Sequence, residues 1–147
     1  MTPIPRAALL LGLAGLLPFG WNLGTLLSPA LAQTALDWLG PRFVGPYVGL
    51  AYGTVILSFM AGVLWGFAVR GRSWVYYALS VIPALWVFFF VGGGPEQATL
   101  CLISGFAGLL ALDWVFWRAG LAPAWWMRLR LILSAVVLAS LTLALYA

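Results

Sequence analysis

Apolar residues dominate the chain in five long runs, separated by short segments rich in glycine, proline and arginine. The runs cover residues 7–27, 47–69, 74–91, 98–116 and 124–146. Each run is close to the ~20 residues that a helix needs to cross a bilayer. The pattern therefore predicts an all-α integral membrane bundle of about five transmembrane helices, forming a single domain over residues 1–147.

The local breaks in this pattern predict further detail. The first run is longer than the apolar core of a signal peptide, about 7–15 residues, so we expect a retained helix. Pro18 predicts a kink within it, and neighbouring helices can satisfy the carbonyl that a kink frees. Pro83 falls inside the third run in the same way. The longest connection, residues 28–45, predicts a short interfacial helix over 30–39, capped by Ser28 and ended by Gly40.

Composition supports the membrane class and narrows the chemistry. The chain is 65% apolar and 7% charged, against about 25% charged residues in a soluble domain. It has no histidine and one cysteine, Cys101, so the usual general base and an internal disulfide are both missing. We therefore predict no enzymatic activity, no catalytic residues, no metal site and no cofactor.

The charged residues predict an orientation in the membrane. With the N-terminus in the cytoplasm, the inner side holds six arginines: Arg6, Arg70, Arg72, Arg118, Arg128 and Arg130. The outer side then holds Arg42, Asp37 and Glu96. Short cytoplasmic loops carry the excess of positive charge, so we expect the N-terminus inside and the C-terminus outside. The arginines are scattered rather than clustered on one face, which argues against nucleic-acid binding.

The second run carries a stripe of small residues. Thr54, Ser58, Gly62 and Gly66 recur at four-residue intervals and share one helix face. Such stripes let another helix approach closely. The fourth run offers a matching surface, formed by Cys101, Ser104, Gly105, Gly108 and Ala111. We expect these two helices to pack together at the centre, and the alternative is a ligand or ion path lined by Tyr52, Ser58 and Trp65.

Asp113 is the acidic residue that falls inside a predicted span. Ionisable groups at that depth are costly and are usually paired or functional. Arg118 lies about one helical turn away, and Arg70, Arg128 and Arg130 approach the same side. One interpretation is an ion pair that fixes helix ends, and the other is a proton or cation site.

Arg128 and Arg130 lie near the start of the last run, shortly after two tryptophans, Trp125 and Trp126. Basic residues at a helix entry can hold anionic lipid headgroups, and they can also act as simple topogenic anchors. Membrane lipids are therefore predicted partners, along with other membrane protein subunits or a second copy of the chain.

Two segments resemble a known family. Residues 52–66, YGTVILSFMAGVLWG, resemble the YGxxILSFxGGxxWG signature of the transmembrane protein 69-like family. Residues 119–130, AGLAPAWWMRLR, resemble its second signature, a turn followed by a basic helix entry. The chain departs from the pattern at Ala61, where glycine is common, and at Leu64, where a basic or polar residue often precedes the tryptophan. The resemblance implies a small multi-span membrane protein and no particular reaction, because the family has no assigned function.

These observations leave three functional hypotheses. The first is a non-catalytic accessory, assembly or scaffolding subunit of a larger membrane complex, in a bacterial inner membrane or, in a eukaryote, the mitochondrial inner membrane. The second is a carrier or sensor that binds a small hydrophobic ligand between helices. The third, a small proton- or ion-coupled transporter, depends on Asp113.

Overall fold

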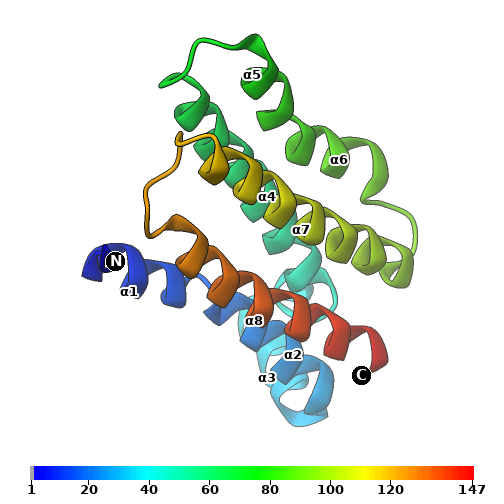
Figure 1. Cartoon of the computed structure of the whole chain (residues 1–147). Helices are drawn as coiled ribbons and strands as arrows, with labels where there is room; N and C mark the ends of the chain where they lie inside the picture. The colour runs from blue at the N-terminus through cyan, green and yellow to red at the C-terminus, as the bar shows by residue number, and fades with distance from the viewer. Residues whose placement is uncertain (1) are drawn as a thin grey trace.

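The computed structural model describes residues 2–147, and within them the chain is helical with no strand (Figure 1). The elements in chain order are α1 (Arg6–Ala14), α2 (Leu17–Leu27), α3 (Pro29–Leu39), the 3-10 turn η1 (Pro41–Phe43), α4 (Tyr47–Ala68), α5 (Trp74–Ser80), α6 (Ile82–Phe90), α7 (Pro95–Arg118) and α8 (Trp126–Tyr146). The prediction of an all-α membrane bundle is confirmed.

Four helical segments of residues 2–147 are long and apolar enough to cross a membrane: Arg6–Leu27, Tyr47–Ala68, Pro95–Arg118 and Trp126–Tyr146. A fifth apolar segment, Trp74–Phe90, is shorter. Every end of the five segments lies within three residues of the end predicted for the corresponding run.

Two of these segments are broken, and a proline marks each break. Pro18 lies in the first turn of α2, and Pro83 lies in the first turn of α6. Proline suits this position because the first N–H groups of a helix have no intrahelical acceptor. Each proline thus starts a new helix after a short interruption, at Gly15–Leu16 in the first segment and at Val81 in the third.

The connection between the first two long segments folds as the sequence indicates. The Ser28 hydroxyl accepts a hydrogen bond from the Leu31 N–H at 3.2 Å, with Pro29 as the first residue of α3. Gly40 has φ of +94°, which ends the helix. The predicted short helix and both of its ends are confirmed.

Helices α4 and α7 form the centre of the bundle (Figure 1). They pack against each other, with α2 and α8 on one side and α5 and α6 on the other. Leu57 and Leu64 of α4 and Leu102 and Leu109 of α7 are almost completely buried between the layers. A Cβ atom at Gly53 would lie 2.9 Å from a terminal methyl group of Leu102, so a larger residue there would displace this buried side chain at the contact between α4 and α7.

The face that α4 presents to α7 differs from the predicted one. Ser58, Gly62 and Gly66 are exposed on the outside of the bundle, and a Cβ added at either glycine meets nothing within 4 Å. The prediction that this stripe packs inside the bundle is wrong. The buried series is Gly49, Gly53, Leu57, Met60, Ala61, Leu64 and Ala68, whose large members fill the space that small residues would leave empty.

The surface predicted on α7 is corrected in the same way. Gly105 is buried, where an added Cβ would lie 2.9 Å from both Leu57 and Trp86. Ser104, Gly108 and Ala111 are exposed instead, and Cys101 is half-buried. The two central helices therefore pack together as expected, but through neighbouring faces.

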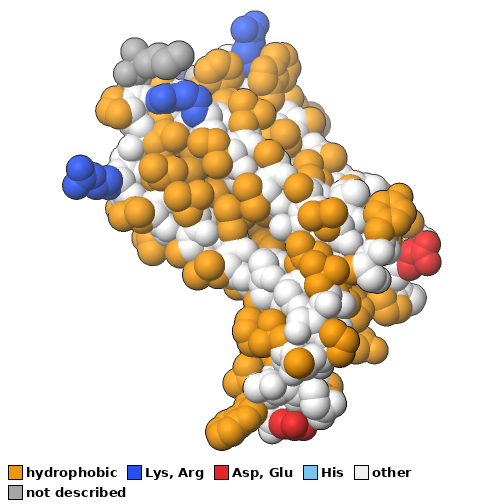
Figure 2. Space-filling view, turned by 90° about the horizontal axis from the view of Figure 1, so that it is seen from below, with side chains coloured by type: hydrophobic (Ala, Val, Ile, Leu, Met, Phe, Trp, Pro, Cys, Tyr) orange, Lys and Arg blue, Asp and Glu red, His pale blue; other side chains and the backbone are white. Residues whose placement is uncertain are grey.

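Charged side chains separate along the bundle. Arg6, Arg70, Arg72, Arg118 and Arg128 lie at or near the helix ends on one side, whereas Asp37, Arg42 and Glu96 lie at the opposite ends. Figure 2 shows basic side chains near one end of the molecule and acidic ones away from it.

Candidate functional site

A tight turn between α7 and α8 brings the intramembrane charges together. Gly120, with φ of +76°, follows the end of α7, and the Leu121 N–H donates back to the Phe116 carbonyl at 3.1 Å. This pattern closes the helix with a left-handed residue. The Arg70 side chain donates to the Leu121 carbonyl at 3.0 Å and ties the turn to α4. As a result, α8 runs back along α7 and faces Asp113.

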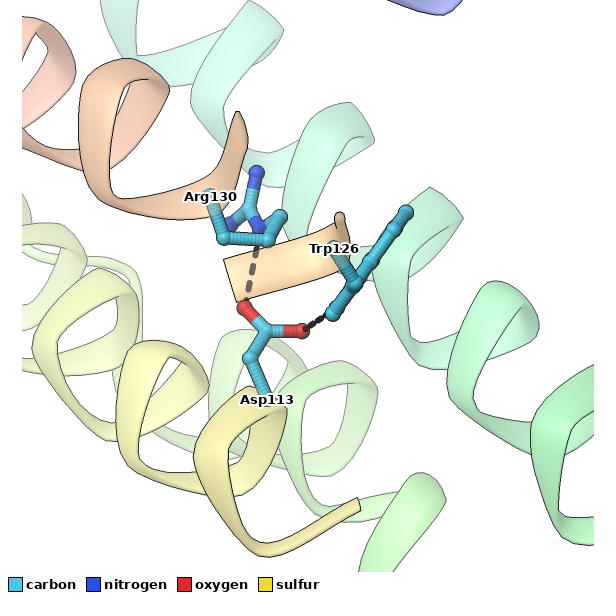
Figure 3. Close-up of polar contacts among 3 residues, drawn as sticks. All are labelled: Asp113, Trp126 and Arg130. Atoms are coloured by element: carbon cyan, nitrogen blue, oxygen red, sulfur yellow. Dashed lines mark hydrogen bonds and ion pairs between the residues drawn. The ribbon is translucent and has the colours of Figure 1, made fainter. Parts of the chain in front are cut away.

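Asp113 lies at the centre of a buried polar cluster (Figure 3). Its Oδ2 accepts a hydrogen bond from Arg130 Nε at 2.8 Å, and its Oδ1 accepts one from Trp126 Nε1 at 3.0 Å. Asp113 is 0% exposed and Arg130 is 6% exposed. Both carboxylate oxygens are therefore hydrogen-bonded, and the two opposite charges are paired away from solvent.

This cluster links two helices and neutralises two charges within the apolar part of the bundle. An unpaired charge at that depth is strongly unfavourable, so each partner makes the other tolerable. Among residues 2–147, no three histidine, cysteine or acidic side chains come together. The geometry fits the interpretation of Asp113 as half of an ion pair, and its role as a proton or cation site stays a prediction.

Arg130 was predicted to hold lipid headgroups, and this prediction is wrong because its side chain is paired with Asp113 inside the bundle. Arg130 and Arg128 are two positions apart, which places them on opposite sides of a helix. Arg130 thus points into the bundle, while Arg128 is half-buried at its edge and donates to the Thr2 carbonyl. Arg118 lies over the ring of Trp114, 5.6 Å from its centroid. Lipid binding by Arg128 stays a prediction.

The suggested path through Tyr52, Ser58 and Trp65 is not formed by these side chains. The Tyr52 hydroxyl donates to the Gly15 carbonyl at 2.9 Å. Trp65 packs edge-on against Tyr77 with centroids 4.8 Å apart, and Ser58 faces outward. The three side chains have separate surroundings, and none of them hydrogen-bonds to Asp113, whose partners are Trp126 and Arg130.

Tyr52 instead stabilises the break between α1 and α2. The Phe19 N–H donates to Leu16 rather than to Gly15, so the Gly15 carbonyl lacks its helical donor. The Tyr52 hydroxyl supplies the replacement from α4. A neighbouring helix thus supplies a donor to the Gly15 carbonyl at the break.

An open apolar groove of about 840 Å³ lies outside the bundle core, between α2, α3, η1 and α4. Its walls include Leu17, Trp21, Leu31, Phe43 and Val55, and Arg42 lies at its edge. The Trp21 indole donates to the Phe43 carbonyl at 2.7 Å and holds the turn against α2. Sequence reasoning missed this groove, since it depends on how residues 28–45 fold back over α2.

Fold and site together define a small multi-span α-helical membrane protein with a charge pair sealed in its core. The chain belongs to the transmembrane protein 69-like family. The family model described as "Protein of unknown function (DUF3429)" matches residues 4–146. Transmembrane protein 69 of Xenopus tropicalis is 33% identical over an aligned length of 144 residues, and the alignment covers 93% of this chain and 53% of that protein.

The chain thus spans about half the length of this relative. No solved structure matches the chain. The comparisons agree with the family resemblance of residues 52–66 and 119–130, and they extend it over almost the whole chain.

Proposed function

We propose that this protein is a non-catalytic accessory, assembly or scaffolding subunit of a larger membrane complex. Its location would be a bacterial inner membrane or, in a eukaryote, the mitochondrial inner membrane. The residue types that commonly perform catalysis are scarce in the sequence. The intramembrane carboxylate of Asp113 is already paired with Arg130, which supports a structural role for Asp113.

The outward face of α4 carries this proposal. Ser58, Gly62 and Gly66 form a small-residue stripe that nothing within residues 2–147 covers. Helices in lipid associate through van der Waals packing, and small residues allow the backbones to approach. A stripe that is not used within the bundle is suited to a helix from another chain. Ser104, Gly108 and Ala111 give α7 a second surface of the same kind.

Photo-crosslinking from this face tests the proposal. A photoreactive phenylalanine analogue replaces Phe59, which is 63% exposed beside the stripe, and a matched control replaces Val136 on α8, which is 41% exposed. We expect a protein adduct from position 59 and none from position 136. Mass spectrometry of the adduct distinguishes a different subunit from a second copy.

A stripe variant makes this test specific. Gly62→Leu places a large side chain on the stripe, where none of the described residues 2–147 lies within 4 Å of an added Cβ. We expect Gly62→Leu to fold normally and to abolish the adduct at position 59. Lipid adducts alone at position 59, or an adduct that Gly62→Leu leaves unchanged, would contradict the subunit proposal.

The open groove favours a second candidate function, a carrier or sensor for a small hydrophobic ligand. Its volume of about 840 Å³ lies within the about 300–1,000 Å³ of typical ligand pockets. Lipidomic mass spectrometry of protein purified in mild detergent tests this role. A retained molecule that is lost in Val55→Trp, which fills the groove, would support it over the subunit role.

A further inference from the structure

A second, smaller cavity of about 150 Å³ lies inside the bundle, beside the break between α1 and α2. Its walls come from α1, α2, α4, α7 and α8, and they are mostly apolar. Phe19 and Phe106 line one part and pack edge-to-face with centroids 5.9 Å apart. Leu11 and Phe59 also line it and are 74% and 63% exposed. The cavity therefore reaches the outer surface of the bundle between α1 and α4.

Two polar side chains of α8 interrupt this apolar wall, Arg130 and Ser134. They are four positions apart, so they lie on the same face of the helix, one turn apart. Ser134 is 2% exposed, and its hydroxyl has no hydrogen-bond partner within residues 2–147. Serine and threonine in a helix commonly bond to the carbonyl four residues before, as Ser104, Thr54 and Thr99 do here. Ser134 departs from this pattern.

Arg130 also has unused donors at the cavity. A guanidinium group carries five N–H donors, and within the described residues Arg130 donates to protein through Nε alone. Figure 3 shows a terminal nitrogen of Arg130 pointing away from Asp113. The ion pair with Asp113 therefore fixes the guanidinium while leaving its far edge available.

The charge balance of the cavity determines which ligand suits it. Arg130 is already neutralised by Asp113, and no other charged side chain lines the cavity. A bound anion would therefore add an unbalanced negative charge within the membrane, which is strongly unfavourable. A neutral oxygen acceptor satisfies the same donors without that penalty. The volume is comparable to that of an apolar cavity known to hold a benzene ring.

We propose that this cavity binds a neutral, ring-sized apolar molecule whose carbonyl oxygen accepts hydrogen bonds from Arg130 and Ser134. A hydrophobic tail on that ring would leave the bundle between Leu11 and Phe59. This site differs from the groove between α2 and α4, with which it shares Leu16 as a lining residue, and it does not depend on the proposed subunit role.

Equilibrium binding to the full chain in lipid nanodiscs tests the site. The probe is decyl-1,4-benzoquinone, and decylbenzene is the matched compound without carbonyl oxygens. Empty nanodiscs measure partition into lipid, which is subtracted. We expect saturable binding of the quinone at least about tenfold tighter than that of decylbenzene, the range of one or two hydrogen bonds.

Variants on α8 locate the bound carbonyl. Ser134→Ala removes the unpaired hydroxyl and should weaken quinone binding about five- to tenfold. Its melting temperature without probe should equal or exceed that of the parent, because no hydrogen bond is lost. Ser140→Ala is the control, since Ser140 lies on the same helix but does not line the cavity. Three results would each overturn the proposal. They are equal affinities for decylbenzene and the quinone, an unchanged quinone affinity in Ser134→Ala, and no saturable binding because the cavity holds water only.

Discussion

The side chain of Asn22 in α2 caps the first turn of α4 by accepting a hydrogen bond from the Gly49 N–H at 3.0 Å. The first N–H groups of a helix have no acceptor within it, so here the cap comes from a neighbouring helix. Asn22 is 3% exposed, and a Cβ at position 49 would lie 2.5 Å from its Cγ atom. The contact that satisfies α4 therefore also requires glycine at position 49.

Gly49→Ala should destabilise the protein. The added methyl group overlaps Asn22 and either displaces its side chain or separates α2 from α4. Overpacking of this kind costs about 1–3 kcal/mol, and loss of the cap adds to it. Thermal unfolding in detergent, followed by tryptophan fluorescence, should show a lower midpoint and a lower yield of folded protein.

Gly62→Ala is the matched control on the same helix. A Cβ at position 62 meets nothing within 4 Å, and alanine is the better helix former by about 1 kcal/mol in peptides. We expect an unchanged or slightly raised melting temperature. Equal losses of stability in Gly49→Ala and Gly62→Ala would contradict the placement of the two faces of α4.

Asp113→Asn should be among the most destabilising single changes in the chain. It leaves the buried Arg130 charge without a partner, and breaking a buried pair costs about 3–5 kcal/mol. Asp37→Asn, at an exposed position, should change stability by less than about 0.5 kcal/mol.

The double variant Asp113→Leu with Arg130→Met distinguishes the cost of leaving one charge unpaired from the net contribution of the ion pair. It removes both charges together, so it should recover much of the stability that Asp113→Asn loses. A double-mutant cycle on chemical denaturation midpoints measures the coupling. If the losses of stability in the single variants Asp113→Leu and Arg130→Met simply add up in the double variant, the two side chains are not coupled and the ion pair makes no contribution of its own.

Much of the fold could be predicted because a bilayer imposes simple rules on the chain. Helix lengths follow from apolar runs, and Pro18, Ser28 and Gly40 act locally, so their effects can be read from neighbouring residues. The face that α4 turns to α7 could not be read in this way. Two small-residue series run along that helix, and the choice between them depends on large side chains of α7 such as Leu102.

The charged part of the candidate site could be predicted from the sequence, whereas its cavities could not. Asp113 stands out because an acid within an apolar run needs a partner. The partner could have been found from helical spacing: Trp126, Arg130 and Ser134 recur every four residues and share one face, whereas Arg128 points elsewhere. The outer groove and the inner cavity depend on tertiary packing of residues far apart in sequence, and no local pattern marks them.

Tyr52→Phe should weaken the junction of the first and second long segments. It removes the hydroxyl that donates to the Gly15 carbonyl at 2.9 Å and retains the ring that packs edge-on against Phe19. One such hydrogen bond contributes about 0.5–1.5 kcal/mol. Tyr47→Phe, which alters a tyrosine that is 59% exposed, is the control. Identical unfolding midpoints for Tyr52→Phe and the parent would mean that the broken helix does not need this donor.

The orientation of the bundle can be tested with reporters at its two ends. The termini lie at opposite ends of the molecule (Figure 1), as an odd number of crossings requires. Five arginines lie at the end that holds Arg6, and short basic loops are retained on the cytoplasmic side. We therefore expect a reporter fused after residue 147 to report the outer side, and one inserted between Arg70 and Ser73 to report the cytoplasm. A cytoplasmic signal at residue 147 would mean that one of the five segments, and by length the Trp74–Phe90 segment first, does not cross the membrane.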